Sequence, residues 1–190
     1  MGRRRVEIVV PGWLDRRLDE ESLLPTRPEQ MRFVIGLARA NVREGTGGPF
    51  AAAVVEHSSG RVVSAGVNLV MPLGNCTAHA EMVAIELAER AVGEYDLGAG
   101  GREHDLVSSV EPCAMCLGAI VWSGVSGLVC GGRDADARAI GFDEGPKTAD
   151  WVDQLECRGI GVERDVLRPE AVAVLQEYAR SGGVIYNARR

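Results

Sequence analysis

The sequence has no run of apolar residues long enough to cross a membrane, since a spanning helix needs about 20 of them. Its arginine-rich start resembles the basic end of a secretion signal, but the apolar stretch behind it is interrupted by Glu7 and closed by Pro11. Such a stretch is too short and too broken for a signal peptide. We therefore expect a soluble protein that has no membrane partner and is cytoplasmic.

Cysteine is sparse, with five residues in a chain of 190. This odd, thinly spread set differs from the dense, even sets of small secreted domains that are held by disulfides. We expect the thiols to be reduced or to bind a metal ion.

Positive charge is in deficit, and Lys147 is the only lysine in the chain. The 27 acidic residues outnumber the 21 basic ones, which gives a formal net charge of −6. Such a chain has no overall attraction to a phosphate backbone, although its arginines could still form a local patch. We expect a small-molecule partner and no nucleic acid.

The remaining composition is that of an ordinary globular protein, with 46% hydrophobic and 25% charged residues. A chain of this length can bury a substantial core without metal or disulfide crosslinks. Residues 1–26 mix charge and proline without a sustained period, so we interpret them as an N-terminal extension packed irregularly on the domain. Residues 27–190 are predicted to form a single domain.

Apolar periodicity predicts an alternation of helices and strands. The expected helices cover 28–42, 79–92, 113–122, 151–155 and 169–180, and the expected strands cover 50–55, 62–70, 106–110, 127–131 and 160–166. Strands that are followed by crossover helices lie parallel in one sheet. The order therefore predicts an α/β fold, a three-layer α/β/α sandwich with a five-stranded mixed sheet.

The most informative motif is His79-Ala80-Glu81, followed later by Pro112-Cys113-Ala114-Met115-Cys116. Thiolates three positions apart at a helix start face the same point, and the helix N-terminus favours their ionised form. His79 completes a set of three ligands, which is typical of a catalytic zinc site with water in the fourth position. We therefore predict one zinc ion per chain, bound by His79, Cys113 and Cys116.

Glu81 lies two residues beyond the histidine ligand and is not required as a ligand itself. A carboxylate in this position can carry a proton from the activated water to a ring nitrogen and then to a departing amine. His-x-Glu with a later Pro-Cys-x-x-Cys is the pattern of zinc deaminases that act on nucleobases. Glu81 is therefore the predicted proton carrier.

The cysteine pair has other interpretations. It could be a redox pair or half of a structural zinc site with Cys76, Cys130 or Cys157 as a fourth ligand. A closed structural site would leave Glu81 and Pro112 without a role, so we favour the catalytic metal. Cys130 lies in an apolar strand and is expected in the core, whereas His57 and His104 fall in predicted turns and are expected to be solvated.

These residues and the order of elements resemble the cytidine deaminase-like superfamily, and within it the bacterial guanine deaminases, over about residues 28–190. The segments that carry the resemblance, besides the metal motif, are 47–54, 65–68, 111–120 and 140–146. The resemblance implies a cytidine deaminase-like fold and hydrolytic deamination of a free nucleobase, most specifically guanine to xanthine and ammonia.

The resemblance also implies which residues meet the base. The Asn68 side chain and the Ala80 backbone N–H would hydrogen-bond it, and Phe50, Trp122 and Phe142 would pack on its ring. Glu144 would recognise its N–H edge and help to move protons. Core packing for Phe50 and Trp122, a turn role for Asn68 and a solvated position for Glu144 remain alternatives.

The resemblance further implies that residues 182–187 close the pocket, within a homodimer that could exchange this segment. Rival substrates at the same metal site are cytosine, another aminopurine, a pterin and an amino-triazine. Two rival functions are a transfer-RNA adenosine deaminase, which should surround its site with basic residues, and a non-catalytic module stabilised by zinc.

Overall fold

The computed structural model describes residues 7–188, so the arginine-rich start and the last two residues of the predicted domain lie outside the described residues. The helices are α1 (Gly12–Glu20), α2 (Arg27–Arg43), α3 (Val70–Leu73), α4 (Ala80–Val92), α5 (Ala114–Ser123), α6 (Asp134–Ala139), α7 (Trp151–Glu156) and α8 (Arg168–Arg180), with a short 3-10 helix at Ala99–Gly101. The strands are β1 (Ala51–Glu56), β2 (Val62–Val67), β3 (His104–Val110), β4 (Gly127–Gly132) and β5 (Gly161–Glu163). Within residues 7–188, no helix has both the length and the apolar character of a membrane span.

The five strands form one mixed sheet in the order β2-β1-β3-β4-β5. Strand β1 is antiparallel to both β2 and β3, whereas β3, β4 and β5 run parallel. Every residue of β3 and of β4 is buried, so both faces of the sheet centre are covered. The predicted mixed sheet with parallel later strands is confirmed.

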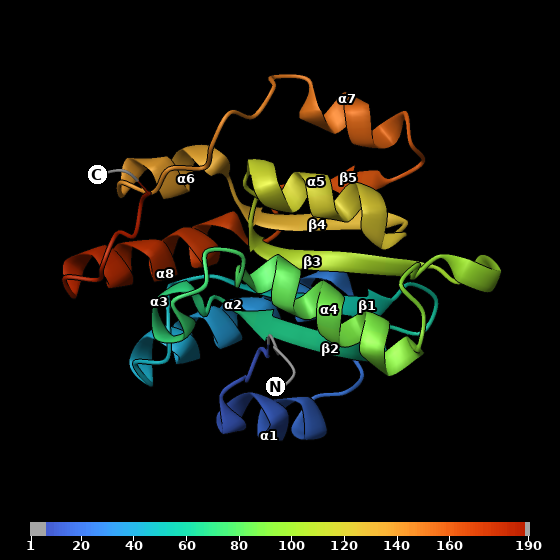
Figure 1. Ribbon diagram of the computed structural model, residues 1–190, viewed down its shortest axis with the longest axis horizontal. Helices are drawn as coiled ribbons and strands as arrows, with labels where there is room; N and C mark the ends of the chain where they lie inside the picture. Colours follow the sequence, from blue (N-terminus) through green and yellow to red (C-terminus); the bar gives the residue numbers. More distant parts are fainter. Residues whose placement is uncertain (1–6, 189–190) are drawn as a thin grey trace, which may run out of the picture.

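Helices cover the two faces of the sheet and give three layers (Figure 1). On one face α1, α2 and α8 enclose a core that includes Leu14, Met31 and Val174. On the other face α4, α5 and α7 enclose a second core that includes Ile85, Ile120 and Trp151. The predicted α/β/α sandwich is therefore confirmed, and α4 and α5 lie next to each other on the same face.

The approach of α4 to β2 depends on Gly66. A Cβ atom at this position would overlap the Ala80 carbonyl oxygen and the Ala84 nitrogen. The Ser64 hydroxyl, also on β2, donates a hydrogen bond to the Ala84 carbonyl over 2.6 Å. These contacts hold the first turn of α4 against the sheet and thereby place His79, which precedes it.

The N-terminal extension is more regular than predicted, because residues 12–20 form a helix. This helix has no clear apolar period in the sequence, because most of its residues are charged and only Leu14 is fully buried against the core. The Trp13 indole N–H also donates to the Thr46 hydroxyl over 3.1 Å. The expectation of irregular packing was wrong for this helix, while the division of the chain at residue 26 stays a prediction.

Two strands are shorter than predicted. The strand expected over 62–70 ends at Val67, and Val70–Leu73 turns into α3. The strand expected over 160–166 pairs with β4 only over Gly161–Glu163, because Asp165 and Leu167 adopt left-handed backbone angles that end an extended chain. Helix α6 was not predicted.

Candidate active site

The three predicted metal ligands come from the starts of two neighbouring helices. His79 is the N-cap of α4 and Cys113 the N-cap of α5, and Cys116 lies in the first turn of α5. His79 Nδ1 lies 3.5 Å from Cys113 Sγ and 3.6 Å from Cys116 Sγ, and the two sulfur atoms are 3.6 Å apart. A tetrahedral zinc ion would separate its ligands by about 3.6 Å for nitrogen and sulfur and about 3.8 Å for two sulfurs. The donor set therefore fits zinc.

The two thiols of this cluster differ in acidity. The hydrogen bond with Cys116 lowers the pKa of Cys113 to about 4, and the bond to His79 acts in the same direction against the effect of burial. The hydrogen bond with Cys113 and burial raise the pKa of Cys116 above its usual range. These contacts favour one thiolate and one thiol in the cluster, and zinc that binds both cysteines would displace the remaining proton.

The structure provides no fourth cysteine for a closed zinc site. Among residues 7–188 the cluster of possible metal ligands consists of His79, Cys113 and Cys116. Cys76 and Cys157 are exposed, and Cys130 is fully buried in β4, as predicted. A set of three ligands leaves a coordination position open, as catalytic zinc sites require.

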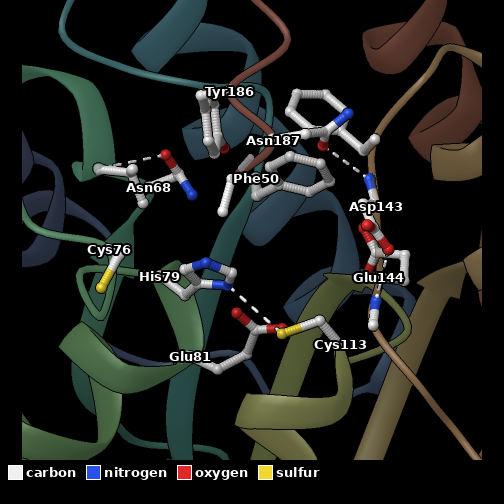
Figure 2. Close-up of a pocket in the computed structure, with 14 residues that line it drawn as sticks. Phe50, Asn68, Cys76, His79, Glu81, Cys113, Asp143, Glu144, Tyr186 and Asn187 are labelled. Carbon is white, nitrogen blue, oxygen red and sulfur yellow. Dashed lines mark hydrogen bonds between the residues drawn. The ribbon is translucent and has the colours of Figure 1, made fainter. Parts of the chain in front are cut away.

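Glu81 is buried beside the ligand atoms. Figure 2 shows its carboxylate next to the Cys113 sulfur and below the His79 ring. Burial raises the pKa of Glu81, and the neighbouring Cys113 thiolate raises it further. The Ser108 hydroxyl lies 3.5 Å from Glu81 Oε1. The first turn of α4 thus places an acid of raised proton affinity at the metal site.

A cavity of about 290 Å³ opens above this cluster. It is lined by Phe50, Asn68, Val70, Cys76, His79, Glu81, Cys113, Phe142, Asp143, Glu144, Gly145, Tyr186, Asn187 and Ala188. Of the residues predicted to meet the base, Phe50, Asn68, Phe142 and Glu144 therefore share one cavity with the metal ligands.

Glu144 faces this cavity from the segment that follows α6. It is only 8% exposed, and burial raises its pKa to about 8, with added contributions from the Cys113 thiolate and from Glu81. Its backbone carbonyl accepts a hydrogen bond from the Ala114 N–H over 3.0 Å. The alternative that Glu144 is a solvated loop residue was wrong for its position.

Asn68 follows β2 and lies on the opposite wall of the cavity. The Asn41 side-chain amide donates to the Asn68 and Gly48 carbonyls, each over 2.9 Å. A Cβ atom at Gly47 would overlap the Asn68 carbonyl oxygen, so this close approach requires glycine there. Figure 2 shows the Asn68 amide nitrogen directed into the cavity.

The aromatic residues divide between the cavity and the surface. Phe50 and Phe142 meet edge to face with centroids 4.9 Å apart, and Phe142 also contacts Tyr186 at 5.1 Å. Trp122, by contrast, is 82% exposed and lines a separate surface hollow. Its predicted contact with the base was wrong for the cavity of its own chain, because the outer side of α5 faces away from that cavity.

The predictions for the Ala80 backbone and for the two histidines outside the metal site have different outcomes. Ala80 is buried as the first residue of α4, and the role of its N–H stays a prediction. His104 is not solvated, since it is 2% exposed and its Nδ1 lies 2.8 Å from the Leu97 carbonyl oxygen. It begins β3 instead of lying in a turn. His57 lies in a turn as expected, with its Nδ1 2.8 Å from Asp105.

The C-terminal segment contributes Tyr186 and Asn187 to the cavity wall. The sequence predicted them only as part of the closing segment 182–187. The Asp143 N–H donates to the Asn187 side chain over 2.9 Å, and Asn187 donates to the Gly141 carbonyl over 2.8 Å. The Tyr186 hydroxyl is buried without a partner among the described residues. The signals available for this segment were one aromatic and one amide residue near its end. Cys76, which the sequence offered only as a fourth ligand of a closed zinc site, lines the cavity instead.

Comparison with known families gives a match over more than half of the chain. The family model described as "Cytidine and deoxycytidylate deaminase zinc-binding region" matches residues 26–132. This range includes the three candidate metal ligands and Glu81, and it excludes Glu144 and the C-terminal segment.

Individual relatives extend this similarity. The guanine deaminase of Bacillus subtilis (strain 168) is 37% identical over 114 residues, which are 60% of this chain and 69% of that protein. A solved structure of the guanine deaminase from Nitrosomonas europaea has 43% identity and a TM-score of 0.89, over 94% of this chain and 100% of that one. A structure of NE0047 with 2,6-diaminopurine has 46% identity and a TM-score of 0.90, over 97% of each chain. The tRNA-specific adenosine deaminase of Haemophilus influenzae is 32% identical over 60% of this chain and 62% of that protein.

Proposed function

Because this chain belongs to the cytidine and deoxycytidylate deaminase family, we propose that it is a hydrolase that converts guanine and water to xanthine and ammonia. The observation that carries the proposal is one cavity that contains metal-ligand atoms, two buried carboxyl groups and a side-chain amide. The similar guanine deaminases and the purine bound to NE0047 favour guanine over other aminated heterocycles.

Glu81 is proposed to transfer the protons of this reaction. A zinc ion held by His79, Cys113 and Cys116 would supply a Lewis acid that activates water. Glu81 takes a proton from the attacking water and delivers it to the ring nitrogen beside the carbon that bears the amino group. It then helps to protonate the departing amine, so that the carbon–nitrogen bond breaks and ammonia leaves. Its raised pKa favours holding that proton between the two steps.

The base is proposed to lie between two polar walls. Asn68 offers its amide N–H group from one side, since its Oδ1 accepts from the Val70 N–H over 3.4 Å, and Glu144 meets the N–H edge of the base from the other. Phe50 and Phe142 contact the ring, the Ala80 N–H bonds an acceptor of the base, and the free Tyr186 hydroxyl offers a further hydrogen bond. A buried carboxyl with a pKa near 8 carries its proton at neutral pH, so Glu144 can both donate and accept.

A panel of substrates tests this proposal. Zinc-loaded protein is incubated with guanine, cytosine, adenine, a pterin, an amino-triazine and a tRNA anticodon stem, and ammonia release is measured. We expect guanine to have the highest kcat/KM. Turnover of cytosine without guanine would reject the substrate while keeping the reaction class, and salt-dependent turnover of the RNA alone would favour an RNA deaminase.

Glu81→Gln tests the proposed proton carrier. We expect kcat to fall by about 10²- to 10⁴-fold, because the amide cannot accept and return a proton. Zinc content and thermal unfolding serve as controls and should match the wild type. An active Glu81→Gln protein would reject the proton carrier. A wild-type protein that binds zinc but deaminates no base in the panel would favour a zinc-stabilised module.

We also propose a homodimer formed through the outer side of α5. Only Cys116, Ile120 and Ser123 of this apolar helix are buried, and Trp122 and Met115 are exposed. The adjoining hollow is lined by apolar residues that include Ile8, Met82, Ile85, Tyr95 and Ala119. Light scattering should give twice the chain mass, and Trp122→Glu should shift it towards the monomer. In this structure the C-terminal segment lines the cavity of its own chain. In the proposed dimer it could instead close the cavity of the partner subunit.

A cytoplasmic location is proposed on the chemistry of the ligands. All five cysteines are free, and two of them must be thiolates to bind zinc. A reducing compartment keeps them in that state. Fractionation of cells that produce the protein should recover it with cytoplasmic markers, and recovery with membranes or culture medium would contradict this location.

A further inference from the structure

Lys147, the only lysine of the chain, has a buried ammonium group. Its side chain is 7% exposed, and Nζ donates to the Pro112 carbonyl over 3.1 Å. Nζ also lies 3.2 Å from Asp134 Oδ1 and 3.6 Å from Glu111 Oε2. The ring of Trp151 lies below it, with its centroid at 4.9 Å. A buried charge with this many partners is held in one position.

These partners connect Lys147 to the segment that carries a metal ligand. Pro112 directly precedes Cys113, and Lys147 follows Glu144 by three positions. The Ala114 N–H donates to the Glu144 carbonyl over 3.0 Å, and the Lys147 N–H donates to the Gly145 carbonyl over 3.1 Å. Two bonds therefore join the segment 144–147 to the segment 112–114. One is at Glu144, through its carbonyl, and the other is at Lys147, through its ammonium group. A short segment fixed at both ends has little freedom to move its side chains.

The bond to Pro112 distinguishes Lys147 from the other cations nearby. Glu111 is also paired with Arg164, whose Nε lies 2.6 Å from Oε1, and Asp134 is also paired with Arg138. Each acidic partner of Lys147 therefore has a second cation. Arg138 also donates to the Gly145 carbonyl over 2.9 Å and so joins the Glu144 segment to α6. The link from this segment to the Pro112 carbonyl, directly before Cys113, is made by the Lys147 side chain.

We propose that Lys147 is a positioning residue, which fixes the Glu144 carboxyl relative to the metal ligands by bonding its own segment to the Pro112 carbonyl. This inference rests on the proposed role of Glu144 in binding the base. Lys147 itself is not among the described residues that line the cavity. It acts through the backbone of residues 144–147, and its loss would let Glu144 shift away from the base.

Lys147→Met tests the proposal, because methionine keeps an unbranched apolar stem and removes the ammonium. Arg164→Met is the matched control, since Arg164 also pairs with Glu111 and also lies over Trp151, at 5.4 Å from the ring centroid. A displacement of about 1 Å can reduce turnover by about 10²-fold, so we expect kcat/KM for guanine to fall by that order in Lys147→Met. Arg164→Met should stay within about threefold of the wild type, since it lies outside the tether. Equal losses in the two variants would overturn the proposal.

Lys147→Arg covers the case in which the methionine variant does not fold. Arginine keeps the charge beside Glu111 and Asp134, but a planar guanidinium does not replace a compact ammonium at the Pro112 carbonyl. We expect wild-type zinc content and thermal unfolding with at least about a tenfold loss of kcat/KM. Wild-type kcat/KM in the arginine variant would contradict a tether that depends on the ammonium geometry.

A double-mutant cycle separates positioning of Glu144 from a general structural role. Guanine affinity is measured by calorimetry in a Glu81→Gln background, where turnover does not interfere, for Lys147→Met, Glu144→Gln and their combination. If Lys147 acts through Glu144, its substitution should weaken binding only when Glu144 is present. Independent, additive losses would overturn the proposal. Full affinity and turnover in Glu144→Gln alone would instead reject the proposed role of Glu144, whatever Lys147→Met does.

Discussion

The Cys113 thiol shows how neighbours can outweigh burial at a single residue. Burial disfavours a thiolate, but the hydrogen bonds with Cys116 and His79 and the start of α5 favour it, and its pKa falls to about 4. Cys130, equally apolar in type, lies among core residues and has its pKa raised by burial. We therefore expect the same residue type to be reactive at position 113 and inert at position 130.

This contrast predicts a pattern of alkylation. In zinc-free protein at neutral pH, iodoacetamide should label Cys113 rapidly through the cavity, because its thiol is already ionised, while Cys116 and Cys130 stay unlabelled. Zinc should protect Cys113. Peptide mass spectrometry measures the rates, and the exposed Cys76 and Cys157 serve as internal references. Labelling of Cys113 at the same rate with and without zinc would contradict its role as a ligand.

The raised pKa of Glu144 predicts a pH dependence of stability. The folded protein holds this proton up to a pKa of about 8, whereas the unfolded chain releases it near the ordinary value of 4.5. Between these values the folded state binds more protons, so the free energy of unfolding falls as pH rises. The wild type should therefore lose stability relative to Glu144→Gln between about pH 5 and pH 9, as measured by denaturant unfolding. A constant difference between the two proteins would show that burial does not shift this carboxyl.

At the scale of elements, the position of α4 depends on the absence of a side chain at Gly66. Gly66→Ala should cost about 2 kcal/mol or more of unfolding free energy, because the new methyl overlaps backbone atoms of α4 that cannot rotate away. It should also weaken zinc binding, because His79 moves with the helix. Denaturant unfolding and zinc titration measure the two effects.

Gly36→Ala is the control for Gly66→Ala. Gly36 lies in α2, and a Cβ atom there would meet only the end of the Arg17 side chain, at an ordinary contact distance of 3.9 Å. Alanine is the better helix former, so this variant should be more stable by about 0.5–1 kcal/mol. Equal effects of the two substitutions would contradict the close approach of α4 to β2.

The elements that sequence analysis predicted well are those with strong periodicity. Helix α2, α4 and the fully buried strands β3 and β4 follow from apolar spacing, and the metal ligands follow from motif spacing at helix starts. Helix α1 was missed because charged residues dominate it. Trp122 was misplaced because the family resemblance assigned it to the ring of the base, whereas its position in α5 leaves it exposed and outside the cavity.

The contacts that were not predictable join distant parts of the chain. Lys147 meets Pro112 across 35 positions, and Asn187 meets Gly141 across 46. No local pattern encodes such pairs, because each depends on where the sheet and its helices bring the loops. The metal cluster and the wall residues Phe50, Asn68, Phe142 and Glu144 were therefore predictable, whereas the long-range contacts that hold the walls together were not.

At the scale of the whole molecule, the candidate zinc site joins two helices on one face of the sheet. His79 belongs to α4 and both cysteines belong to α5, so a bound ion links the two helix starts. Zinc that binds only the folded state stabilises it by about 4 kcal/mol when it exceeds its Kd a thousandfold. For a chain of this size, that corresponds to about 10 °C in Tm.

Removal of zinc with a chelator should therefore lower Tm by about 10 °C, and adding zinc back should restore it. Differential scanning calorimetry measures the shift. His79→Ala serves as the control, because its Tm should respond little to chelator or to zinc. An unchanged Tm after proven loss of zinc from the wild type would contradict a metal link between α4 and α5.

The seating of the C-terminal segment over the cavity has a consequence for the order in which products leave. Tyr186 and Asn187 line the cavity, and Asn187 is bonded to the segment that carries Glu144. We expect ammonia, which is small, to leave while these residues stay in place, and the larger purine to require their displacement. Xanthine should therefore dissociate after ammonia and act as a competitive product inhibitor against guanine. Its dissociation rate should be set by the displacement of the C-terminal segment from the cavity.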